Sequence, residues 1–153
     1  MKSKCAFCCL GVLLAASQLL AAPSWLPASS SDRPRLQSIY GEEHLIEELR
    51  DQSTKALVIV FMGIDCPVVR HYVPRLNELY AKFNLQNVKF LAIYANAGEH
   101  VLAMAPHASQ TDLAFPAFID VHHRLADLLD AQVMSEVVVL DRDFEKRLSR
   151  SYR

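Results

Sequence analysis

The chain has 153 residues, with 16 lysines and arginines against 17 aspartates and glutamates, a formal net charge of −1 at pH 7. A nearly neutral chain carries no electrostatic footprint for nucleic acid, so we expect no nucleic-acid partner. The length suits one domain with one core, and a hydrophobic content of 52% is too high for a disordered chain. The sequence therefore predicts a single globular domain.

The first 22 residues have the pattern of a secretory signal peptide. Two lysines lie within Met1–Lys4, residues 5–22 carry no charge, and the stretch ends in the small residues Ala21 and Ala22. We expect cleavage near Ala22 and export to the periplasm or the extracellular space. The alternative is an uncleaved membrane anchor through residues 5–22, which are only just long enough to span a bilayer. The chain would be bound to a membrane only in that second case.

A flexible linker is predicted over residues 23–38, because this stretch is rich in proline and serine. The folded domain is predicted over residues 39–153. A short helix is expected at Glu42–Asp51, where leucine and isoleucine recur at helical spacing. Ala56–Met62 is apolar at successive positions, which is typical of a strand that is buried on both faces of a sheet.

The clearest helix follows Cys66, with apolar residues spaced three and four apart from Val69 to Phe83. Pro74 lies inside this helix and is expected to kink it. The remaining expected elements are strands at Val88–Ala95, Phe115–Ile119 and Val137–Leu140, a weak helix at Glu99–Ala105 ended by Pro106, and helical turns at Arg124–Leu129. Strands that alternate with helices predict an α/β domain with a mixed sheet.

Cys66 is the strongest candidate for a reactive residue. It lies between a strand and a helix, and the N-terminus of a helix favours the thiolate, which is the nucleophilic form of cysteine. The neighbouring Asp65 opposes the thiolate, and Arg70, one helical turn on, could offset that charge. We therefore predict Cys66 and Arg70 as catalytic residues. For Arg70 and His71, an exposed polar helix face is the alternative interpretation.

The histidines do not suggest a metal site. His122 and His123 are adjacent in sequence and would point apart on a helix, and His44, His100 and His107 show no ligand spacing. We expect no bound metal and no cofactor. Delivery of copper through Cys66 and a histidine is a distant alternative.

The order of these elements resembles the thioredoxin superfamily, and within it the redoxin or peroxiredoxin-like (AhpC/TSA-like) branch. The resemblance implies a thioredoxin-like three-layer α/β/α domain with a mixed central sheet. It also leads us to expect a C-terminally shortened member, since relatives continue beyond a hairpin after Leu140 and Asp141. The matching segments are Val58–Pro67, Val88–Ile93, Phe115–Asp120, Arg124–Asp127 and Ser135–Asp143.

Four positions depart from the family pattern. Val69 occupies the place of the second cysteine of thioredoxin-type enzymes, and Arg70 that of the second cysteine of copper-chaperone members. Gly63 stands where peroxiredoxins have a threonine. Ser135 stands where the family has a cis-proline, so we expect a trans peptide bond and a differently shaped loop there.

Two functions remain open. In the first, the exported protein uses Cys66 alone to react with peroxide or a partner disulfide, because Cys5, Cys8 and Cys9 leave with the signal peptide. An external thiol or a partner protein's cysteine must then reduce the oxidised Cys66 back to the thiol, as in a thiol-dependent peroxidase or oxidoreductase. In the second, the chain is a catalytically degenerate thioredoxin-fold module that binds a partner or serves a structural role.

Overall fold

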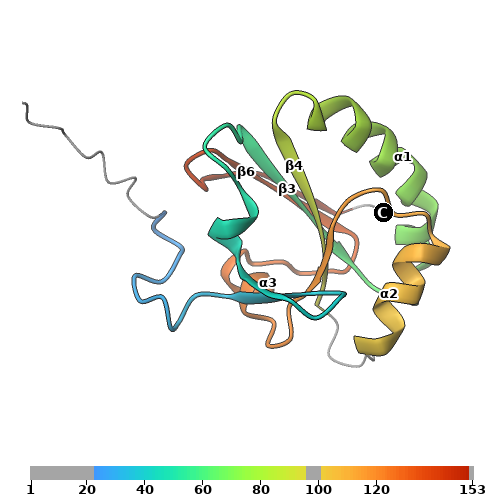
Figure 1. The fold of residues 1–153 in the computed structure, drawn as a ribbon, viewed down its shortest axis with the longest axis horizontal. Coiled ribbons are helices and arrows are strands. Elements are labelled where there is room, and N and C mark those ends of the chain that lie inside the picture. The colour runs from blue at the N-terminus through green and yellow to red at the C-terminus, as the bar shows by residue number, and fades with distance from the viewer. Residues whose placement is uncertain (1–22, 96–100, 152–153) are drawn as a thin grey trace, which may run out of the picture.

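The computed structural model describes residues 23–95 and 101–151. The predicted signal peptide over residues 1–22 lies outside the described residues. Figure 1 shows a central sheet with helices on both faces. The elements are β1 (Arg35–Ser38), β2 (Glu43–Leu45), a 3₁₀ helix (Ile46–Leu49), β3 (Ala56–Met62), α1 (Pro67–Asn84), β4 (Val88–Tyr94), α2 (Val101–Gln110), β5 (Ala117–Ile119), α3 (Arg124–Leu128), β6 (Glu136–Asp141) and β7 (Lys146–Ser151).

The sheet is mixed, with the strand order β2-β1-β5-β4-β3-β6-β7 among the described residues. β3 pairs in parallel with β4 over seven positions, from Ala56 opposite Val88 to Met62 opposite Tyr94. β4 also pairs in parallel with β5, whereas β6 runs antiparallel to β3. The carboxyl ends of β3, β4 and β5 therefore lie at one edge of the sheet.

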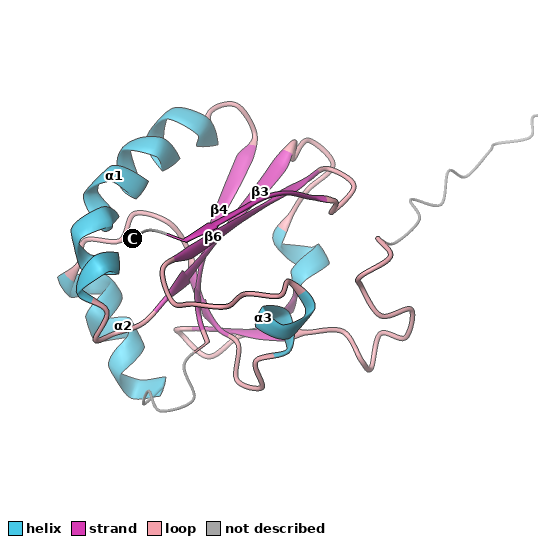
Figure 2. Cartoon of the chain, turned by 180° about the vertical axis from the view of Figure 1, so that it is seen from behind, coloured by secondary structure: helices cyan, strands magenta, loops and turns pink. Residues whose placement is uncertain are grey.

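Each face of the sheet carries its own apolar core. Figure 2 shows α1 and α2 on one side of the sheet and α3 on the other. On one face, Val69, Val73 and Leu76 of α1 and Met104 of α2 pack against alternate residues of β3 and β4. On the other face, α3, the 3₁₀ helix and Leu26 cover the intervening residues of the same strands. This is the α/β/α arrangement that the family resemblance implied, and it confirms that β3 is buried on both faces of the sheet.

The predicted linker over residues 23–38 is corrected at its carboxyl end. Arg35–Ser38 forms β1, which pairs with both β2 and β5 and buries Leu36 completely. Earlier in the stretch, Leu26 is buried, and the indole Nε1 of Trp25 donates a hydrogen bond to the carbonyl oxygen of Phe144 at 2.6 Å. A composition rich in proline and serine concealed the few apolar side chains that hold this segment against the domain.

Two predicted helices also differ from the structure. Glu42–Asp51 was expected to be helical, but it forms β2 followed by one 3₁₀ turn, because Glu43–Leu45 pairs with β1. Pro106 was expected to end a helix, yet it lies inside α2, which continues to Gln110. Proline removes one backbone donor from a helix. Here Met104, His107 and Ala108 are buried against the domain, and this packing carries the helix past Pro106.

The loop before β6 differs in shape from a cis-proline loop, as the sequence predicted. No cis peptide bond occurs in the described part of the chain, and Ser135 adopts a φ of 85°. Its backbone N–H donates to the carbonyl oxygen of Phe61 at 3.0 Å, which ties the loop to the end of β3. Proline has no N–H and a φ fixed near −65°, so it could supply neither feature.

We therefore expect Ser135→Pro to lower the free energy of unfolding by about 2–3 kcal/mol. This holds although proline is the residue that the family resembled by this sequence has at that position. Ser135→Ala, which keeps the N–H group, should cost less than half as much. Denaturant unfolding of the two variants and the parent measures the difference. Equal stability of the proline variant and the parent would show that the Phe61 contact and the positive φ are unimportant.

Candidate functional site

Cys66 lies at the amino-terminal cap of α1, just beyond the carboxyl end of β3. Its N–H donates to the carbonyl oxygen of Gly63 at 3.3 Å, and its own carbonyl oxygen accepts the N–H of Arg70 at 3.3 Å. Pro67 follows at the first helical position, where a missing N–H costs nothing. The strand, turn, cysteine and helix thus follow one another as the sequence predicted.

The Cys66 side chain is half-buried and packs at the rim of the core beneath α1. It opens into a pocket of about 550 Å³ that is lined by Ile64, Asp65, Cys66, Pro67, Arg70, His71 and Pro74. Both residues predicted to be catalytic, Cys66 and Arg70, therefore line the same pocket. Their roles in a reaction remain predictions.

The charged groups of this pocket are exposed and do not pair with one another. Among the described residues, no ion pair within 4 Å joins Asp65 to Arg70 or His71. The His71 ring instead lies edge-on to Tyr72, with ring centroids 5.6 Å apart. Arg70 is thus free to interact with a group that enters the pocket, rather than held by Asp65.

Val69 is 2% exposed and belongs to the face of α1 that packs on the sheet. This is the position at which a thioredoxin-type enzyme carries its second cysteine. Within the described part of the chain Cys66 is the only cysteine, and its thiol is free. The site therefore has one thiol beside the apolar side chain of Val69, and no disulfide can form between these two positions.

A buried polar pair near the end of β4 was not anticipated from the sequence. Tyr94 is fully buried, with its hydroxyl 2.7 Å from Nδ1 of His107. Tyr94 is directly opposite Met62 in the sheet, so the pair lies beside the strand that leads to Cys66. A tyrosine in an apolar strand gives no sequence signal of a partner that comes from a later helix.

Glu136, the residue after Ser135, is a buried carboxylate of this region. Burial alone would raise its pKa, but hydrogen bonds from the Ser149 hydroxyl and from the backbone N–H of Gln132 lower the pKa below its usual value. These contacts tie β6 to β7 and to the loop before β6. Its carboxylate oxygens are therefore engaged in holding the loop.

The histidines and carboxylates of the described residues form no group of three or more that could hold a metal ion. His122 is exposed, and His123 adopts a φ of 55° at the start of α3. In the same part of the chain, no helix combines the length and apolar character needed to cross a membrane.

Known proteins resemble this chain in sequence and in structure. The chain is 27% identical over 110 residues to thiol-disulfide oxidoreductase ResA of Geobacillus kaustophilus, which is 72% of this chain and 60% of that relative. The chain thus spans about 60% of the length of this curated relative, and 54% of that of the ResA protein of Bacillus cereus.

Solved structures show the fold. A secreted Mycobacterium tuberculosis disulfide oxidoreductase homologous to E. coli DsbE superposes with a TM-score of 0.66 and 17% identity, over 82% of this chain and 88% of that one. A thioredoxin-like protein of Aeropyrum pernix superposes with a TM-score of 0.65 and 13% identity, over 80% and 83% of the two chains. The fold is thioredoxin-like.

The family model of the AhpC/TSA family matches residues 35–145, which include every element from β1 to β6. This range contains both Cys66 and Ser135. The chain therefore belongs to the AhpC/TSA family.

Proposed function

We propose that this protein carries out thiol redox chemistry with Cys66 as its single nucleophile. The observation that carries the proposal is the position of Cys66: it is the N-cap residue of α1, and its half-buried side chain lines an open pocket beside Arg70. Unpaired N–H groups at a helix start stabilise a thiolate. The curated relatives, named thiol-disulfide oxidoreductases, support this class of reaction.

With a disulfide as oxidant, the Cys66 thiolate attacks one sulfur and displaces the other as a thiolate, which leaves a mixed disulfide. With a peroxide, the thiolate attacks one oxygen, the other oxygen leaves as an alkoxide or hydroxide, and Cys66 becomes a sulfenic acid. An external thiol condenses with the sulfenic acid and releases water, which again gives a mixed disulfide. A second external thiol then frees Cys66 and carries away the new disulfide.

In a chain that begins at Pro23, Cys66 is the only cysteine and Val69 stands where a second one would resolve the mixed disulfide, so the resolving thiol must come from outside that chain. We propose that it is a small thiol or a partner protein's cysteine. Arg70 would stabilise the Cys66 thiolate from its place in the same pocket. Gly63 offers no hydroxyl to a bound peroxide, which favours a disulfide over a peroxide as the oxidant.

We also propose that the protein is exported, on the basis of the signal pattern of residues 1–22. One structural neighbour is described as secreted, which is consistent with export. We expect N-terminal sequencing of the protein from its native cells to begin near Pro23. An intact Met1 on cytoplasmic protein would contradict export.

For the chain from Pro23 onward, in which Cys66 is the only cysteine, we expect alkylation by iodoacetamide at neutral pH to be faster than that of glutathione. Arg70→Ala should slow alkylation about two- to fivefold, the range of an exposed charge interaction. The matched control is Arg75→Ala, which removes an exposed arginine of the same helix that pairs with Glu78. It should leave the rate unchanged.

Turnover tests the same proposal. The parent should reduce a small disulfide, or hydrogen peroxide, at the expense of an added thiol, and Cys66→Ser should reduce the rate to background. Slow alkylation, together with equal rates for Cys66→Ser and the parent, would contradict the redox function. That result would leave the alternative of a thioredoxin-fold binding module without catalysis.

A further inference from the structure

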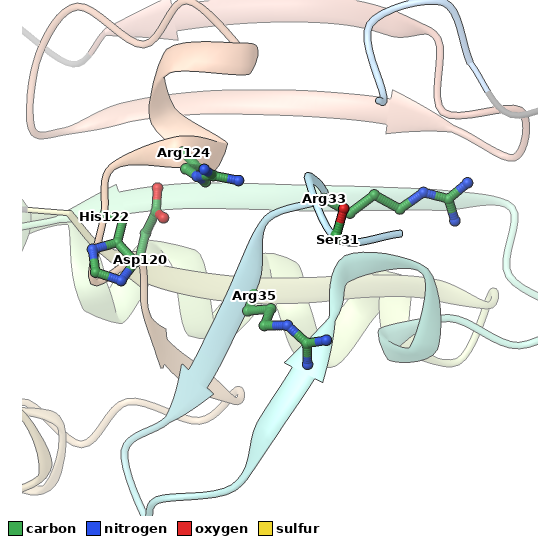
Figure 3. A pocket seen from close by; sticks show the side chains of 6 residues that line it. All are labelled: Ser31, Arg33, Arg35, Asp120, His122 and Arg124. Carbon is green, nitrogen blue, oxygen red and sulfur yellow. The ribbon is translucent and has the colours of Figure 1, made fainter. Parts of the chain in front are cut away.

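A second pocket, of about 500 Å³, lies at the same edge of the sheet as Cys66 but on the far side of β4. It is lined by Ser31, Arg33, Arg35, Asp120, His122 and Arg124 (Figure 3). Asp120 follows β5 as the Cys66 loop follows β3, and both strands run parallel to β4. Ligands of open α/β sheets commonly bind beyond the carboxyl ends of the strands.

Arg33 is bonded to neighbouring residues and forms part of the pocket wall. Arg33 donates from Nε to the carbonyl oxygen of Pro27 at 3.0 Å, and its Nη1 lies 2.5 Å from a carboxylate oxygen of Glu47. Its Nη2 donates to the carbonyl oxygen of Ala28 at 3.4 Å. The guanidinium group is thus occupied, and it fixes the segment that contains Ser31 against the domain.

The other two arginines keep free donors. Among the described residues Arg124 has no carboxylate within 4 Å, and its Nη1 donates only to the carbonyl oxygen of Asp32, at 3.1 Å. Arg35 has one carboxylate contact, with Glu43 at 3.8 Å, and both side chains of that pair are more than half exposed. Exposed contacts of this length contribute little free energy, so both guanidinium groups are available to a ligand.

The one carboxylate in the lining, that of Asp120, is buried and bonded to the backbone of α3. Asp120 is 2% exposed, and its Oδ2 accepts the N–H of Ala126 at 2.9 Å. Burial raises the pKa of Asp120 above its usual value, although hydrogen bonds from the backbone of α3 act in the opposite direction. The exposed groups of the lining are therefore the two arginines, His122 and the Ser31 hydroxyl.

We propose that this pocket binds the phosphate group of a small phosphorylated molecule through Arg35 and Arg124, with His122 and Ser31 beside them; the Ser31 hydroxyl lies 2.7 Å from the Ser29 hydroxyl and 3.4 Å from an Asp32 carboxylate oxygen. These groups come from two stretches of the chain, residues 31–35 and 122–124, and stand on different sides of the pocket (Figure 3). A tetrahedral oxyanion presents oxygens in several directions and suits such an arrangement better than a planar carboxylate. Guanidinium groups are favoured donors to phosphate. The site is independent of the chemistry at Cys66.

The probes are inorganic phosphate and pyrophosphate, titrated into the full chain by calorimetry at constant ionic strength. We expect saturable binding that weakens about tenfold in Arg35→Gln and in Arg124→Gln. The control is Arg150→Gln, which removes an exposed arginine of β7 outside the pocket and should bind like the parent. If Arg124→Gln unfolds, the affinity of Arg35→Gln tests the proposal alone. Arg35 contacts only the exposed Glu43, so its replacement should leave the domain folded.

Three results would overturn the proposal. The first is no saturable binding up to about 10 mM probe, and the second is an equal loss of affinity in Arg150→Gln and Arg35→Gln. The third is tighter binding of citrate than of pyrophosphate, which would assign the pocket to carboxylates instead of phosphate. Binding that persists unchanged in Cys66→Ser would confirm that the two sites are independent.

Discussion

The structure depends on the pairing of β3 with β4, which are parallel over seven positions and buried on both faces by separate groups of helices. A one-residue shift in the register of such a strand would turn every side chain to the opposite face of the sheet, where it would meet the wrong core. The end of β3 is therefore fixed in space, and the loop from Gly63 to Cys66 starts from a fixed point. The position of the sulfur is a consequence of this constraint.

The same packing accommodates the two residues that replace the second cysteine and the cis-proline of the family pattern. Val69 and Val73 face the sheet and fill the core beneath α1, so the residue one turn after Cys66 is apolar and buried. Ser135 ties its loop to the end of β3 through a backbone N–H that a proline does not have. Both departures from the family pattern are thus integrated into the packing, and among the described residues they leave Cys66 without a neighbouring second thiol; the proposed function therefore requires an outside partner for each cycle.

The sequence predicted β3, α1 and β4 well, because long apolar patterns are imposed by burial on one or both faces. It predicted β1 poorly, since four residues that follow a proline- and serine-rich stretch carry no distinctive pattern, and only their pairing with β5 makes them a strand. Cys66 and Arg70 could be proposed together because one helical turn separates them. Two groupings could not be predicted from local sequence patterns, because each joins distant segments: Tyr94 with His107, and Arg35 with Arg124.

The central claim is that the folded chain presents Cys66 as an accessible nucleophile, and the formation of a mixed disulfide tests it most directly. The chain from Pro23 onward would be mixed with oxidised glutathione at neutral pH and followed by intact mass and peptide mapping. The account predicts one glutathione on Cys66, formed faster in the folded chain than in the urea-unfolded chain, and released by added thiol. A folded chain that forms no adduct, or forms it more slowly than the unfolded chain, would contradict the account.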